Sequence, residues 1–173
     1  MKLSTVLTLA VSIIGYASAA PAPFTPDPVN NVQFFVESEN PNVQGKSLHH
    51  RHEGAAVDFV FLGDAPATFK YDYKTDVITA DVGTEYPLYF SVLSGVEFPT
   101  LQVSAASSYY TKWAVEDGYL TGNGSSNFIA AKNTGDPYNY SKDSFQVALF
   151  PEGGIPGRYV TDVTDVKIKV VYV

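Results

Sequence analysis

The sequence predicts an all-β protein, built as a single compact antiparallel β-sandwich. Short segments rich in β-branched and aromatic residues recur along the chain, separated by Gly, Pro, Asn and Asp clusters at intervals of about 8–12 residues. No window sustains the 3.6-residue periodicity of a helix. Eleven Phe, twelve Tyr and one Trp supply apolar area for a core that has no cysteine to reinforce it.

Each predicted strand is a short apolar or alternating run that ends at a turn cluster. In order, they are residues 32–38, 55–62, 67–73, 76–82, 86–93, 101–105, 109–115, 128–132, 144–150 and 167–173. Segments 69–82 and 112–124 share an order of aromatic residue, Asp, turn and apolar return. This similarity keeps a β-trefoil-like barrel as the alternative architecture.

The chain divides into three parts. Residues 1–19 have a basic start, an apolar stretch too short to anchor in a bilayer and the small residues of a cleavage site, so we expect a signal peptide. Residues 20–30 contain four prolines and indicate an extended leader. Residues 31–173 form the expected single domain, and the final strand-like segment lacks the pattern of a lipid-anchor signal.

The charge of the chain excludes two classes of partner. Its formal net charge is −7, and the acidic residues are spread along the sequence. Nucleic acids and anionic membrane surfaces both require a basic patch, so neither is expected. The composition instead suits a secreted protein in a mildly acidic medium.

All three histidines lie in residues 46–55, with Glu53 beside them. In a strand, His50 and His52 share a face while His49 points the other way. Two imidazoles on one face could hold Zn²⁺ or Cu²⁺ with a third ligand from elsewhere, but the neighbouring Arg51 opposes a cation. We therefore predict no metal site and no cofactor, and keep a histidine metal site as a minor alternative.

No catalytic residue is nominated. The Gly-x-Ser-x-Gly motif of serine hydrolases is absent, and the lack of cysteine removes thiol chemistry. Eighteen acidic residues allow many carboxylate pairs, and only their separation in space would identify a glycosidase. A small glycosidase therefore remains the less favoured enzyme alternative.

Carbohydrate binding is the sharper functional alternative, because sugar sites combine exposed aromatic faces with polar edges. Two segments, 107–120 and 136–145, are rich in both kinds of residue. Trp113 in the first is expected in the core. In the second, the Asp-Pro pair interrupts a strand and favours exposure. The candidate sugar-binding residues are Asp136, Tyr138 and Tyr140.

Two Asn-x-Ser sequons begin at Asn123 and Asn139. Both lie in turn-forming segments, where an attached glycan would disturb no packing. In a secreted eukaryotic chain these asparagines are the predicted N-glycosylation sites.

Two stretches together resemble the N-terminal domain of the Candida-type yeast wall proteins. They are "RHEGAAVDFVFL" (51–62) and "AAKNTGDPYNYSKDSFQV" (130–147), with weaker similarity at 69–72. The residues that carry the resemblance are Arg51, His52, Glu53, Gly54, Asp136, Pro137, Tyr138 and Tyr140. In the first stretch we expect a turn at Gly54 leading into a buried strand, with Arg51 and Glu53 paired at the surface or capping nearby backbone.

The resemblance implies a secreted, wall-associated protein without catalytic activity, with a role in wall organisation, adhesion or its suppression. Wall polysaccharide or mannoprotein is the partner that it implies. Members usually continue into a Ser/Thr-rich stalk and a GPI signal, whereas this sequence stops at Val173, so we expect a secreted or loosely held protein without a membrane anchor. No oligomeric state is assigned.

Overall fold

The structure is a computed structural model that describes residues 28–106 and 110–173, and within these ranges the chain is built almost entirely from β-strands. The predicted signal peptide and most of the predicted leader lie outside the described residues. The elements are β1 (Val29–Glu37), β2 (Ser47–Gly54), β3 (Val57–Gly63), β4 (Phe69–Asp72), β5 (Val77–Ala80), β6 (Leu88–Val92), β7 (Leu101–Ser104), β8 (Trp113–Glu116), β9 (Tyr119–Gly122), β10 (Asn127–Lys132), the 3-10 helix η1 (Tyr140–Lys142), β11 (Gln146–Phe150) and β12 (Thr161–Tyr172). The described residues include no helix long and apolar enough to cross a membrane.

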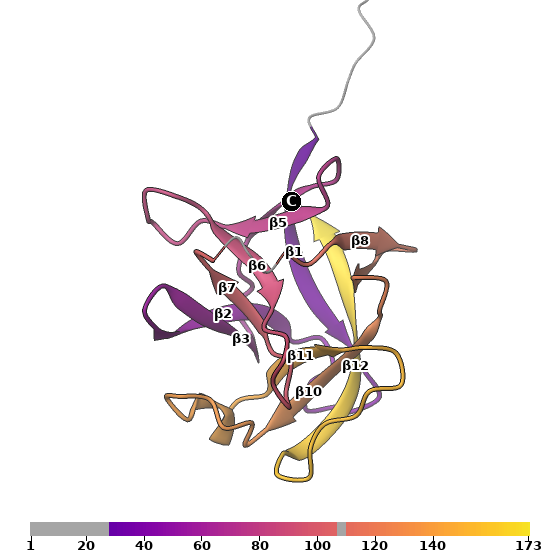
Figure 1. Cartoon of the computed structure of the whole chain (residues 1–173). Helices are drawn as coiled ribbons and strands as arrows, with labels where there is room; N and C mark the ends of the chain where they lie inside the picture. Colours follow the sequence, from indigo (N-terminus) through magenta and orange to yellow (C-terminus); the bar gives the residue numbers. More distant parts are fainter. Residues whose placement is uncertain (1–27, 107–109) are drawn as a thin grey trace, which may run out of the picture.

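The strands form one twelve-stranded sheet in the order β2-β1-β4-β5-β6-β7-β3-β11-β10-β12-β9-β8, with further pairings β2–β3 and β1–β12. Every pairing is antiparallel, which confirms the predicted all-β, antiparallel class. The two layers expected of a sandwich are therefore joined by hydrogen bonds into one continuous sheet that bends round a common interior (Figure 1).

The sheet branches at β1 and β3. On β1, Val32 pairs with both β4 and β12, while Phe35 pairs with both β2 and β12, so β4 and β2 share the edge opposite β12. On β3, Phe59 and Phe61 both pair with β2, and their other neighbours are β7 and β11 respectively. Because one edge serves two partners at each branch, the strands diverge there and curve the sheet around its core.

The main core is packed with aromatic rings. Phe34, Phe69, Phe90 and Trp113 form a chain of contacts, with ring centroids 5.1 Å apart for Phe34–Phe69, 5.2 Å for Phe69–Phe90 and 4.8 Å for Phe90–Trp113. All four are buried, as the sequence predicts for Trp113. Such rings bury large apolar areas and gain further from tilted and stacked contacts, so they compensate for the missing disulfides.

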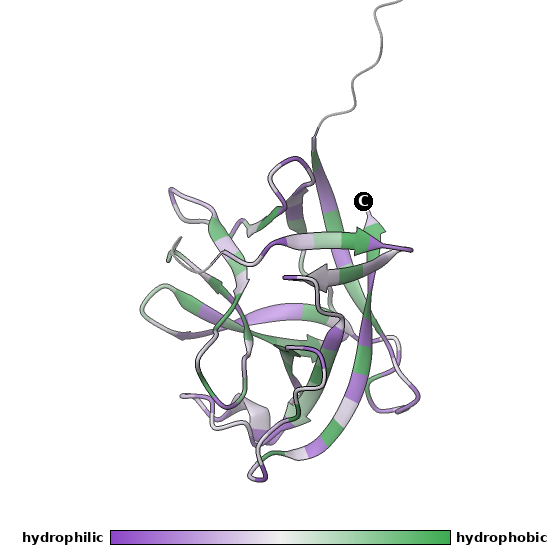
Figure 2. Cartoon of the chain, turned by 45° about the vertical axis from the view of Figure 1, so that its right-hand side comes forward, coloured by the Kyte–Doolittle hydropathy of each residue, from purple (hydrophilic) through white to green (hydrophobic). Residues whose placement is uncertain are grey.

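Alternation along the strands selects which side chains enter the core. On β12, Val166, Ile168 and Val170 are buried while Lys167 and Lys169 are exposed, and the colours alternate along this strand (Figure 2). Strands β10 and β11 are buried on both faces. Their second face belongs to a smaller apolar cluster: Phe98, Ile129, Ala131, Ala148, Phe150 and Val160.

Most predicted strands occur near their expected positions, with four differences. β1 begins at Val29, two residues inside the predicted leader, and β12 begins at Thr161 instead of at residue 167. β2 and β9 were not among the predicted strands. The two segments with a similar residue order are both hairpins, β4–β5 and β8–β9, as that order indicates. They occupy different positions, since β4–β5 lies within the sheet and β8–β9 forms its end.

Candidate functional site

The β2–β3 hairpin positions the residues of the first stretch. Its register pairs Arg51 with Phe59 and His52 with Asp58, and residues 55 and 56 form the turn. Gly54 and Ala56 both have positive φ, at 125° and 58°. The residues that were expected to form a turn therefore form the end of β2, and the turn follows Gly54. Consecutive residues on β2 face opposite sides of the sheet.

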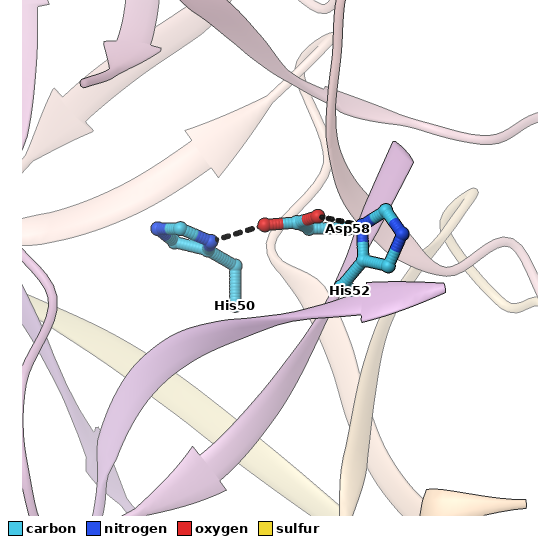
Figure 3. A network of polar contacts seen from close by, with 3 residues as sticks. All are labelled: His50, His52 and Asp58. Carbon is cyan, nitrogen blue, oxygen red and sulfur yellow. Dashed lines mark hydrogen bonds and ion pairs between the residues drawn. The ribbon is translucent and has the colours of Figure 1, made fainter. Parts of the chain in front are cut away.

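One face of the hairpin carries His50, His52 and Asp58 (Figure 3). Asp58 lies between the two imidazoles, at 2.6 Å from Nδ1 of His50 and 3.3 Å from Nδ1 of His52. The predicted shared face of these histidines is thus confirmed, and one carboxylate bridges them. In residues 28–106 and 110–173, no group of three or more His, Cys, Asp or Glu side chains is placed to hold a metal ion.

The other histidine, His49, lies on the opposite face. Its Nδ1 is buried without a hydrogen-bond partner, and its ring lies against Gly63, where an added Cβ would approach the ring to 2.5 Å. Burial, followed by the charge of Arg51, lowers the pKa of His49. The close packing at Gly63 explains why this position has no side chain.

The second stretch forms a loop whose organising residue is Asp136. Its carboxylate accepts hydrogen bonds from the backbone N–H groups of Tyr140, at 2.6 Å, and Ser141, at 3.0 Å, and also from the Ser141 hydroxyl. These bonds satisfy the donors at the start of η1, as an N-terminal capping residue does. Ser141 is buried, and its position five residues after Asp136 of the Asp-Pro pair is the sequence feature that could have identified it.

The loop and the hairpin meet although their contacting residues are far apart in sequence. The backbone N–H of Tyr138 donates to Oε2 of Glu53 at 3.0 Å, across 85 positions. The guanidinium of Arg51 lies 3.6 Å from the centroid of the Tyr140 ring and donates to the Ser144 hydroxyl at 3.3 Å. We name this assembly the hairpin–loop cluster, defined as Arg51, His52, Glu53, Asp136, Tyr138 and Tyr140.

The pKa values of the two carboxyl groups in the hairpin–loop cluster are shifted in opposite directions. Burial, together with the nearby Asp136, raises the pKa of Glu53 to about 7. Burial also acts to raise the pKa of Asp136, but its hydrogen bonds, led by those from Ser141, outweigh burial and lower it. Oε1 of Glu53 is buried without a partner among described groups. A proton on Glu53 removes the charge that burial and the nearby Asp136 disfavour.

The candidate sugar-binding residues differ in their exposure. Tyr138 is 53% exposed and lies beside His52 and Tyr140. Tyr140 is half-buried, with Arg51 over its face and Phe61 against its edge. Asp136 is buried and its oxygens bond to its own loop. The loop therefore presents one free ring, next to the exposed Pro137.

Both sequon asparagines are exposed and both of their serines are buried. Asn123 accepts a hydrogen bond from the backbone N–H of Lys112 at 2.9 Å, and Ser125 donates to the carbonyl of Phe150 at 2.6 Å. Asn139 precedes η1 in the left-handed conformation, with φ of 60°. Each asparagine thus stands at a surface turn, where a glycan can project outward.

Three cell wall proteins of Candida albicans are similar in sequence to this chain. The chain is 36% identical to Cell wall protein PGA30 over 161 residues (91% of this chain, 53% of that protein) and 34% identical to Cell wall protein PGA31 over 139 residues (79% and 47%). It is 30% identical to Cell wall protein RHD3 over 124 residues (69% and 58%). The chain spans about half the length of these curated relatives. No family model matches it, and no solved structure matches it significantly.

Proposed function

We propose that this chain, as a homologue of three Candida albicans cell wall proteins, is a secreted, N-glycosylated, non-catalytic protein of the fungal cell wall. The resemblance drawn from residues 51–62 and 130–147 is confirmed by these homologues. The observation that carries the proposal is the match to a wall protein over 91% of the chain. That relationship supports the extracellular location and the structural or interaction role that we propose.

The hairpin–loop cluster supports a structural role for the matched stretches. Glu53 accepts a hydrogen bond from the backbone N–H of Tyr138, and Asp136 accepts from Tyr140 and Ser141 of its own loop. A glycosidase instead leaves two carboxyl groups free to face a sugar bond, about 5–9.5 Å apart. The polar chemistry of this cluster is therefore directed at joining a loop to a hairpin.

Fractionation of cells that produce the chain naturally tests the proposed location. The cells are separated into medium, detergent-extractable wall, glucanase-released wall and cell contents, and the chain is followed with an antibody. We expect the chain in the medium and in one or both wall fractions, with little in the cell contents. A chain confined to the cell contents would overturn the proposal, and a known cytosolic enzyme serves as the marker for lysis.

The two sequons give a separate expectation. Because Asn123 and Asn139 are exposed at turns, each should carry an N-glycan in the secreted chain. Digestion with an N-glycosidase should lower the apparent mass of the chain. Asn123→Gln and Asn139→Gln should each make this loss of mass smaller, because each variant lacks one glycan. An unchanged mass after digestion would refute glycosylation without bearing on the location. Asn127→Gln, which lies outside a sequon, is the matched control.

A further inference from the structure

A groove of about 630 Å³ lies on the outer surface of β4, β5 and β6, away from the hairpin–loop cluster. Its floor is the outward row of the sheet, because Lys70 pairs with Thr79 and Thr79 pairs with Tyr89 across neighbouring strands. Residues 110–112 form its opposite wall. The outward side chains of β4, β5 and β6 thus form the base of the groove, while the inward side chains of the same strands pack in the core.

Two tyrosines dominate this groove. Tyr110 is 57% exposed, and its ring meets the Tyr89 ring edge to face, with centroids 5.3 Å apart and an interplanar angle of 84°. An edge-to-face contact is one of the favoured arrangements of two aromatic rings, and it restrains the Tyr110 ring while more than half of this residue stays exposed. A large ring that is both fixed and exposed is suited to stack on a ligand, since little conformational entropy is lost on binding.

The charges that line the groove cancel. Lys70 and Lys112 contribute two positive charges, and Asp72 and Asp76 contribute two negative charges. Thr75, Thr79 and Thr111 also line the groove. Hydrogen-bonding groups beside an aromatic face, with no net charge, suit a ligand that is neutral, rich in hydroxyl groups and apolar on one face. The net charge of −7 for the whole chain further disfavours a polyanion.

A second groove continues the first at Tyr110. This second groove has a volume of about 660 Å³, shares Tyr110 and Thr111 with the first, and is lined largely by apolar side chains such as Val96, Pro99 and Phe150. Because the grooves share two residues, the exposed ring stands where they join. Apolar surface predominates in both grooves, and the first holds more charged side chains. An elongated ligand can cross Tyr110 and contact both, whereas a compact ligand fills one groove only.

We propose that the Tyr89–Tyr110 groove binds a neutral polysaccharide chain, with one sugar ring stacked on Tyr110. Hydroxyl groups of that polymer bond to the Thr79, Asp76 and Lys112 side chains. The inference adds a partner and a site to the wall location proposed above and rests on that location for its biological setting. Binding itself is a property of the purified protein and is tested without reference to location.

The test measures retention of the purified chain, after enzymatic removal of N-glycans, on three probes: particles of β-1,3-glucan, chitin, and immobilised neutral mannan. We expect retention on at least one probe. Tyr110→Ala should weaken that binding about tenfold, the loss expected for one aromatic stacking contact. Tyr110→Phe should bind like the original chain, because it keeps the ring. Tyr138→Ala, which removes the exposed ring of the loop, should also bind normally.

The proposal would be overturned by no retention on any probe, by unchanged binding of Tyr110→Ala, or by loss of binding in Tyr138→Ala instead. Stronger retention on a sulfated polyanion than on the neutral probes would also contradict it, since the groove carries no net charge. Tyr110 is exposed, so its variants should unfold at the same temperature as the original chain, and this measurement separates lost binding from lost folding.

Discussion

Replacing Trp113 by alanine is expected to lower the free energy of unfolding by about 3–5 kcal/mol. Trp113 is fully buried, stacks on Phe90, and donates its indole N–H to the Phe90 carbonyl at 2.9 Å. An added Cβ at Gly122 would come within 2.7 Å of the indole ring, so the neighbouring strand is shaped around it. Alanine would leave a large cavity and an unpaired buried carbonyl.

The measurement is urea unfolding followed by far-ultraviolet circular dichroism, because the variant lacks the only tryptophan. The unfolding free energy of Trp113→Phe should lie between those of the original chain and Trp113→Ala. Phenylalanine keeps a ring against Phe90 but loses the indole hydrogen bond. Tyr86→Ala, at a position 70% exposed, is the matched control and should change stability by less than about 0.5 kcal/mol. A loss below about 1 kcal/mol for Trp113→Ala would mean that this ring does not join β8 to the core.

Replacing Glu53 by glutamine is expected to stabilise the protein above pH 8 by about 2–3 kcal/mol and to have little effect near pH 4.5. Burial raises the pKa of Glu53 to about 7, from 4.5 for an ordinary glutamate. Between these values the folded chain binds a proton that the unfolded chain has released, so the stability of the original protein falls as the pH rises. Glutamine resembles the protonated acid, accepts from Tyr138 and carries no charge to bury.

Unfolding free energies of the original chain and Glu53→Gln, measured from pH 4.5 to pH 8.5, test this expectation. The difference between the two proteins is the informative quantity, because the lowered pKa of His49 makes stability rise with pH in part of the same window. The exposed Glu116, replaced by glutamine, is the control and should give a flat difference. If the difference in unfolding free energy between Glu53→Gln and the original chain is also independent of pH, the pKa of Glu53 is not raised in the folded protein.

The class of fold was predictable from sequence because most strands carry their own signal. In β12 the alternation of Val and Ile with Lys is visible without a structure, and Trp113 was correctly placed in the core. β2 was not predicted as a strand because its sequence, "SLHHRHEG", lacks β-branched residues. It becomes a strand because β3, which is strongly apolar, pairs with it along most of its length.

The hairpin–loop cluster could be predicted only in part. The resemblance marked both matched stretches, but their contact depends on a bend of the whole sheet that no local pattern encodes. The burial of Glu53 and the stacking of Arg51 on Tyr140 follow from that bend. By itself, a glutamate between a histidine and a glycine indicates a surface position. Glu53 is buried because it contacts a loop that lies 85 positions further along the sequence.

The central structural claim is that Glu53, buried where the two matched stretches meet and bonded to the Tyr138 backbone, keeps its proton up to a pH of about 7. The most direct test is an NMR titration of the side-chain carboxyl carbons in the intact folded chain. The structure predicts a pKa of about 7 for Glu53 and a value below the ordinary range for Asp136. A Glu53 pKa near 4.5, with Asp136 in its usual range, would show that loop and hairpin are not joined in this way.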